Sequence, residues 1–399
     1  MPERKCDSRG HLSRTENRHN VLGLDPEELA KLIEPVTGTQ RYRAKQIFGW
    51  IYAKGVFDFD SMHNLSKDLR KALGARFVIE IPKPLKCVVS EEARVSKYVL
   101  SLADGMKIEC VLIGMRDKDT FCVSTQVGCR FHCAFCVTGR MGLKRNLSAS
   151  EILGQVLFLR SASNPAGQTA RDRYGLSRKM TPQGQQGLSL KQATEDAPKP
   201  PDETLRAFNV VFMGMGEPLD NYEHTVKAIR IMEHPDGLAI GGRRITVSTC
   251  GIPERIKRLA REELGVGLAL SLNATTDELR AKLVPAGKAF RMKDVLAAVE
   301  YFAEKSGRRV TLEYVLIGGV NDKPADAKRL ASIASALPCK INLIEFNASR
   351  GTKLTKPSQE AVQQFMQILY PRAPAVTLRK SKGSDIMAAC GQLGAEAYK

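Results

Sequence analysis

The sequence predicts a protein of the α/β class, with an open, partial (β/α)6 barrel preceded by a small helical domain and a short β-extension. From residue 120 onward, strand-like apolar runs alternate with amphipathic helical segments, and consecutive β/α units imply a parallel sheet. A complete eight-unit barrel takes about 250 residues. The chain reaches that length only if a segment without apolar periodicity, 161–205, is counted, so we expect the barrel to be incomplete.

The pattern divides the chain into five parts. Residues 1–20 are poor in apolar side chains and are predicted to be a disordered tail. Helical spacing begins at Asp25, which precedes Pro26 as a helix cap would, and predicts a helical domain over 21–78. Alternating runs on either side of an Ala-Asp-Gly turn predict a β-extension or linker over 79–119. The barrel is expected over 120–395, and its Gln-, Gly-, Pro- and Ser-rich insert, 161–205, is predicted to be disordered.

Composition limits the classes of partner. The 399 residues include 61 Lys and Arg against 43 Asp and Glu, a net charge of +18, which favours a polyanion such as nucleic acid. An evenly solvated basic surface is the alternative. Two stretches contain no acid, one between Asp119 and Glu151 and one between Glu360 and Asp385. No apolar run is long enough to cross a membrane and no secretory signal is evident, so we expect a cytoplasmic protein with reduced thiols.

Three cysteines follow the first barrel strand in a C-x3-C-x2-C arrangement: Cys129, Cys133 and Cys136. Three thiolates with no fourth cysteine at a matching distance suit a [4Fe-4S] cluster that keeps one iron open. Zinc is the alternative metal, but structural zinc sites close with four ligands, and His132 is badly placed to be the fourth because it is adjacent to Cys133. Three unliganded buried thiols are the remaining alternative.

Polar residues and glycines follow several of the predicted strands. The segment Met213–Pro218 (MGMGEP) combines glycines, which let a backbone approach a ligand, with a carboxylate at the end of a strand where barrel sites lie. Each such residue could instead belong to a turn or cap a helix, and Cys122 and Cys390 could be core thiols. The strand-end candidates are Glu217, Ser248, Ser271, Asn273 and Asn347.

The cysteine motif in this context resembles the radical S-adenosylmethionine (SAM) superfamily. Beyond it, the segments MKIECVLI, FCVSTQVGCRFHCAFC, VVFMGMGEP, ITVSTCG, ALSLNA, CKINLIEFN and AACGQL, in this order, resemble the RlmN family of dual-specificity RNA adenine C2-methyltransferases. The resemblance covers residues from about 25 to 395. It implies a [4Fe-4S] cluster, S-adenosylmethionine, and methylation of adenine 2503 in 23S rRNA and of adenine 37 in certain tRNAs.

The resemblance also implies roles for individual residues. Cys129, Cys133 and Cys136 would bind the cluster. Cys390 would carry the methyl group as S-methylcysteine, Cys122 would form a transient disulfide with Cys390, and Glu109 would accept a proton. The implied cofactor-binding residues are Gly216, Glu217, Ser248, Ser271, Leu272, Asn273 and Asn347. Asn273 departs from the family pattern, because many members have His at that position.

The implied partners are 23S rRNA, tRNA and an external electron donor such as flavodoxin or ferredoxin, and the chain is expected to be a monomer. The predicted helices of 21–78, which include Trp50, resemble an RNA-binding accessory domain. Trp50 and Phe48 could instead simply be core residues. Two other functions remain open. One is methylation of adenine C8 by a related methyltransferase, and the other is a non-catalytic iron-sulfur RNA-binding protein.

Overall fold

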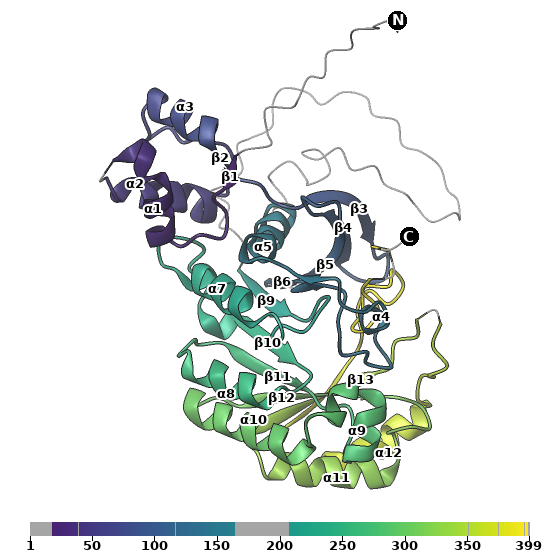
Figure 1. Cartoon of the computed structure of the whole chain (residues 1–399). Helices are drawn as coiled ribbons and strands as arrows, with labels where there is room; N and C mark the ends of the chain where they lie inside the picture. The colour runs from purple at the N-terminus through teal and green to yellow at the C-terminus, as the bar shows by residue number, and fades with distance from the viewer. Residues whose placement is uncertain are drawn as a thin grey trace, which may run out of the picture. The chain divides into compact units, whose positions relative to one another are not determined.

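A computed structural model describes residues 18–38, 40–115, 117–163, 207–349, 351–373, 375–394 and 396–397 (Figure 1). The chain divides into two compact units, Met1–Glu80 and Ile81–Lys399. Most of the predicted tail, 1–17, and most of the predicted insert, 164–206, lie outside the described residues.

The first unit is a small helical domain. Its helices are α1 (Pro26–Thr37), α2 (Tyr42–Phe48) with a π turn at Gly49–Ala53, and α3 (Lys67–Arg76), and short strands β1 (His19–Asn20) and β2 (Phe77–Val78) pair in parallel. Asp25 caps α1 through a capping box with Glu28. Phe48 and Tyr52 are buried, whereas Trp50 is half-buried with the Lys54 ammonium 3.6 Å from its ring centroid. Trp50 is therefore only partly a core residue of this unit.

The second unit is built on one ten-stranded sheet, in the order β14-β13-β12-β11-β10-β9-β6-β5-β4-β3. Within this sheet, β6 and β9 to β14 pair in parallel, which confirms the predicted partial barrel. Figure 1 shows the crossover helices on one side of this sheet. The parallel strands are β6 (Asp119–Cys122), β9 (Phe208–Phe212), β10 (Ile245–Thr249), β11 (Gly267–Ser271), β12 (Val310–Leu316), β13 (Cys339–Glu345) and β14 (Val376–Arg379).

Each crossover carries a helix whose apolar face packs on the sheet. Helix α10, for example, buries Val295, Val299 and Phe302 and ends at Gly307, which adopts the left-handed backbone. The helices are α5 (Ala149–Ser163), α7 (Tyr222–Glu233), α8 (Pro253–Arg261), α9 (Asp277–Leu283), α10 (Met292–Ser306), α11 (Pro324–Ser335) and α12 (Gln359–Leu369). No helix of the described residues is long and apolar enough to cross a membrane.

The β-extension continues the barrel sheet and is not a separate layer. Strands β3 (Lys83–Val89), β4 (Val95–Ser101) and β5 (Lys107–Gly114) are antiparallel, and β5 pairs with the first barrel strand, β6. The predicted turn lies between β4 and β5. This continuity matters for the site, because it places residues of β4 and β5 beside the C-terminal segment of the chain.

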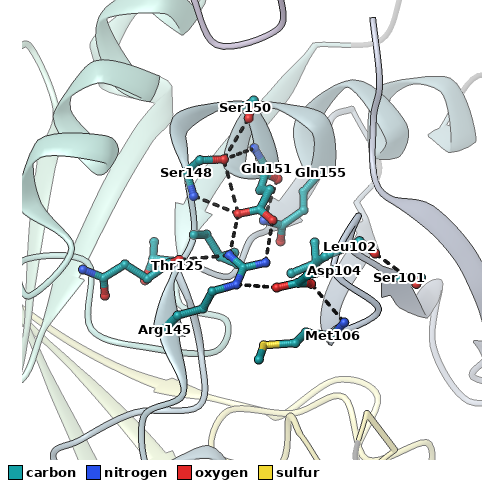
Figure 2. A network of polar contacts seen from close by, with 12 residues as sticks. Ser101, Leu102, Asp104, Met106, Thr125, Arg145, Ser148, Ser150, Glu151 and Gln155 are labelled. Atoms are coloured by element: carbon teal, nitrogen blue, oxygen red, sulfur yellow. Dashed lines mark hydrogen bonds and ion pairs between the residues drawn. The ribbon is translucent and has the colours of Figure 1, made fainter. Parts of the chain in front are cut away.

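A polar network fixes the base of the loop that contains the three clustered cysteines (Figure 2). The loop starts after β7 (Gln126–Val127) and returns through β8 (Arg145–Asn146), which pairs with β7. Arg145 binds Asp104 in the turn between β4 and β5 at 2.7 Å, and Glu151 in the first turn of α5 at 2.8 Å. Arg145 thus belongs to an acid-free stretch of sequence, but its charge is paired with acids from elsewhere.

Gly128 closes the same loop at a position that only glycine fits. Its φ is +81°, and a Cβ there would lie 1.8 Å from the carbonyl oxygen of Gly142. That carbonyl accepts a hydrogen bond from the backbone N–H of Cys129. A side chain at this position would therefore push apart the two ends of the cysteine loop.

We expect Gly128→Ala to lower the free energy of unfolding by more than the ~1–2 kcal/mol of left-handed strain alone, because the clash with Gly142 adds to it. Gly105→Ala is the matched control: its φ is +79° with nothing within 4 Å of the added carbon. Urea unfolding of both variants measures the difference. Equal losses in the two variants would show that the contact with Gly142 is unimportant.

Candidate functional site

A cavity opens at the carboxyl ends of the barrel strands, between the cysteine loop and the C-terminal segment. Its walls come from residues that are far apart in the sequence, because parallel strands bring their carboxyl ends to one edge. The sequence-predicted residues that line it are Cys129, Cys133, Cys136, Gly216, Glu217, Ser248, Ser271, Asn273 and Cys390.

The three clustered cysteines lie on the loop between β7 and the short helix α4 (Val137–Arg140). Burial raises the pKa of the Cys129 thiol to about 12, and it also raises the pKa values of Cys133 and Cys136. Two backbone hydrogen bonds hold this loop in place. The Ala134 N–H donates to the Leu283 carbonyl at 3.0 Å, and the Val137 N–H donates to the Gly391 carbonyl at 2.8 Å.

The donor set fits a [4Fe-4S] cluster. Within the described ranges, no three His, Cys, Asp or Glu side chains are grouped to hold a single metal ion. A cubane makes a different demand, because each of its cysteine ligands binds a separate iron. Cys129, Cys133 and Cys136 surround one cavity, and each has a free thiol. The thiolate is the form that binds a metal, so each of these thiols would lose its proton on binding iron.

Glu217 is the buried carboxylate of the cavity, with 4% of its surface exposed. Burial raises its pKa, while hydrogen bonds from neighbouring donors oppose the shift. Its Oε2 accepts from the N–H of Cys250 at 2.7 Å and its Oε1 from the N–H of Leu219 at 3.1 Å. The preceding Gly216, at φ +101°, would clash with Gln126 if it had a Cβ. The turn therefore holds Glu217 rigidly at the cavity wall.

The other predicted cofactor-binding residues divide into two groups. Ser248, Ser271 and Asn273 line the cavity. Asn273 has φ +57°, a conformation that Asn tolerates, and its Oδ1 accepts from the N–H of Val315 at 2.9 Å.

The second group does not line the cavity. Leu272 is fully buried, and its N–H donates to the Glu313 carbonyl. Asn347 donates from Nδ2 to the carbonyl of Cys390 at 3.4 Å. Asn347 therefore contacts the C-terminal segment that contains Cys390, the predicted methyl carrier.

Cys390 lies where two cavities meet. It lines the cluster cavity and also a second cavity, which is lined by Cys122 as well. Both thiols are free. Cys390 is an exposed residue, and its thiol is reached from these cavities. Desolvation by the neighbouring protein atoms raises the pKa of its thiol, and Arg379 opposes the shift. Arg379 and Lys382 line the second cavity, so the cations of the C-terminal acid-free stretch lie beside the two thiols.

Glu109 lines neither cavity, but it binds the end of the chain that carries Cys390. Its Oε1 accepts from the backbone N–H groups of Glu396 and Ala397 at 2.8 and 3.0 Å. Its Oε2 is 3.6 Å from the Nζ of Lys97, and neither side chain has any exposed surface. Because Val111 of β5 pairs directly with Cys122 of β6, Glu109 and Cys122 point to the same face of the sheet.

Lys97 is a residue that the sequence reasoning missed. Its Nζ also donates to the Met387 carbonyl at 3.1 Å, so the Lys97–Glu109 pair holds the C-terminal segment on both sides of Cys390. Burial lowers the pKa of Lys97, and the Glu109 carboxylate opposes that shift. The available signal was its position in the strand. Lys97 lies two residues from Val95 and from Val99, so it points to the same face of β4 as these two buried residues.

We expect Lys97→Met to lower the free energy of unfolding by about 3–5 kcal/mol, because it leaves the Glu109 carboxylate buried without its partner. Adding Glu109→Gln should recover part of that loss, since both charges are then gone. Lys86→Met is the control: Lys86 pairs with Glu396 but is 40% exposed, so its loss should cost about 1 kcal/mol or less. Urea unfolding of these variants and of Glu109→Gln alone gives the four free energies of unfolding, and fully additive losses for Lys97 and Glu109 would contradict the coupling.

Comparison with known proteins supports the assignment of the cavity as a [4Fe-4S] site of a radical SAM enzyme. Residues 19–79 match a family model described as the ribosomal RNA large subunit methyltransferase N-terminal domain, and 202–331 match the radical SAM superfamily. A dual-specificity RNA methyltransferase RlmN of Campylobacter fetus is 41% identical over 94% of this chain and 97% of its own length. The RlmN of Nautilia profundicola is 40% identical over 92% of this chain and 95% of its own.

A solved structure agrees with the sequence relatives. The crystal structure of a radical SAM methyltransferase from Sphaerobacter thermophilus superposes with a TM-score of 0.81 at 39% identity, covering 95% of this chain and all of the other. The partial barrel and the three-thiol loop, together with these matches, define a radical SAM enzyme, which takes a [4Fe-4S] cluster and S-adenosylmethionine. The chain belongs to the RlmN family of dual-specificity RNA methyltransferases.

Proposed function

We propose that this protein methylates C2 of adenine in RNA, with adenine 2503 of 23S rRNA and adenine 37 of tRNA as its substrates. Cys390 is the methyl carrier and Cys122 its resolving partner. The observation that carries the proposal is the position of Cys390 at the junction of two cavities, one lined by the three clustered cysteines and the other by Cys122. A group on the Cys390 sulfur is thus accessible from both.

The chemistry requires a carrier of this kind. C2 of adenine is electron-poor, so it cannot attack the methyl group of a sulfonium directly. When bound, the cluster and S-adenosylmethionine supply an electron, a methyl group and a hydrogen-abstracting radical. Glu217 and Gly216, together with Ser248, Ser271 and Asn273, would hold the S-adenosylmethionine beside Cys129, Cys133 and Cys136, because all of them line one cavity.

The cysteines then divide the work. The Cys390 thiol loses its proton and accepts a methyl group on sulfur. After this carbon has joined C2, the Cys122 thiolate attacks the Cys390 sulfur. An S–S bond forms and the bond from that sulfur to the transferred carbon breaks; the electron pair of that bond stays with the carbon, which takes up a proton to complete the methyl group. The proton at C2 passes to a base, and the unpaired electron left by the radical addition would return to the cluster. The S–S bond must be reduced before the next turnover.

Glu109 is the proposed base. Its carboxylate shares a sheet face with Cys122, and its Oε2 has no hydrogen-bond partner. Its Oε1 holds the chain end that follows Cys390, so proton transfer and the position of this segment would be coupled.

The cations beside the thiols suit an RNA substrate. Arg379 and Lys382 line the cavity of Cys122, where they can bind phosphates around an extruded adenine. We also propose that the protein acts as a cytoplasmic monomer, and that flavodoxin or ferredoxin supplies the electron. The cytoplasmic location rests on the sequence pattern and is tested by cell fractionation. The monomeric state and the electron donor rest on the family resemblance, and gel filtration and reduction assays test them.

We expect Cys390→Ala to abolish methylation and to leave no methyl group on the protein, because the carrier sulfur is gone. Cys122→Ala should still accept the methyl group but accumulate a protein-RNA adduct. Cys339→Ala is the control, since Cys339 is buried at the start of β13 and lines neither cavity. Mass spectrometry of the RNA and the protein after incubation with S-adenosylmethionine reads all three.

The same experiment separates the alternatives. A C8-methylated adenosine would identify the related C8 methyltransferase activity instead. Methylation that survives Cys390→Ala would exclude the carrier role. An iron-sulfur protein that binds RNA but never methylates it, under reducing and anaerobic conditions, would favour a binding protein.

A further inference from the structure

Arg280 of α9 is a fully buried cation with almost no partners. Its side chain has no exposed surface. Its Nη2 donates to the carbonyl of Cys250, while Nε and Nη1 are buried without a hydrogen-bond partner. It forms no ion pair with any carboxylate in the described part of the chain.

Such an arrangement is costly inside a protein. A guanidinium stays protonated under all ordinary conditions, and a buried charge without a partner costs several kcal/mol. Burial lowers the pKa of Arg280, and the nearby groups that oppose this shift are Cys250, Cys133 and Asp277. Asp277 already accepts from the N–H of Met292 at 2.7 Å. Within the described residues, the guanidinium of Arg280 therefore has no carboxylate bound to it.

The surrounding packing holds Arg280 next to the cysteine loop. Cys250, Leu283 and Val284 form a buried cluster, against which Cys133 and the residues around it pack. The loop is bonded to the end of α9 by the Ala134 N–H. Arg280 is therefore bonded to Cys250, a residue of the apolar group against which Cys133 packs.

We propose that Arg280 is the fixed counter-charge of the [4Fe-4S] cluster and raises its reduction potential. The inference rests on the cofactor assignment and not on methylation. A cluster held by three thiolates is negatively charged, and gaining one electron makes it more negative. A nearby cation and N–H donors to sulfur stabilise the reduced form more than the oxidised form, and this raises the potential. Two unpaired N–H groups of Arg280 provide these donors.

The carboxylate of Glu217 binds the N–H of Cys250, and Arg280 binds the carbonyl of the same residue. The two charges thus share one backbone unit without forming an ion pair. Glu217 remains at the cavity wall, and two nitrogen atoms of Arg280 remain without a hydrogen-bond partner.

The test is a redox titration of anaerobically reconstituted protein, monitored by electron paramagnetic resonance without RNA or S-adenosylmethionine. At a fixed potential we expect Arg280→Met to hold at least tenfold less reduced cluster per oxidised cluster, a shift of about 59 mV for one electron. Arg280→Lys keeps the charge, so its cluster should show a smaller fall in reduction potential. Lys282→Met is the control, because Lys282 lies on the same helix but is exposed. Iron and sulfide analysis confirms equal loading.

An unchanged potential in a fully loaded Arg280→Met protein would overturn the proposal. If that variant does not fold or bind iron, wild-type protein labelled with 15N in its arginine side chains decides the question. Pulsed paramagnetic resonance should then detect a 15N coupling to the reduced cluster, and its absence would equally overturn the proposal. Methylation is not part of either measurement, so a failure of the proposed RNA activity would leave these results interpretable.

Discussion

The position of one sulfur, that of Cys390, depends on how a chain end without helix or strand is held. Backbone groups in such a segment must find partners outside regular secondary structure. Here the partners come from both sides. The Gly391 carbonyl accepts from Val137 of the cysteine loop at 2.8 Å, and the Leu393 carbonyl from the Thr138 hydroxyl at 2.6 Å. The buried Lys97–Glu109 pair holds the other side. The chain end thereby connects the cysteine loop to the β-extension.

The same interior carries charges that a purely structural core would avoid. Lys97, Glu109 and Arg280 have no exposed surface, and Glu217 has very little. Each is buried at the carboxyl edge of the sheet or just behind it. Replacing both partners of a buried ion pair with apolar residues is often neutral or stabilising for a fold. Their concentration around one set of thiols indicates that the site, and not the stability of the barrel, accounts for them.

Much of this site was predictable because the signals are local. The spacing of Cys129, Cys133 and Cys136 specifies a three-thiolate site, and alternating strands and helices specify a parallel sheet. Lys97 and Arg280 were not predicted. One lies in an ordinary alternating strand and the other in a short polar helix, and a lysine or arginine in such places is usually solvated. Their roles come from partners that are far away in the sequence.

The sequence by itself determined the parallel partial barrel and the three-thiol motif, because periodicity and spacing are properties of neighbouring residues. The individual strand-end residues were chosen by the family resemblance. Tertiary structure decided which of these residues share a cavity. It placed Cys122 and Cys390, 268 positions apart by number, on one cavity wall, and it kept Leu272 and Asn347 off the other. It also joined the β-extension to the barrel sheet. Such contacts depend on how the sheet curves and where the chain end crosses it, and no local pattern encodes either.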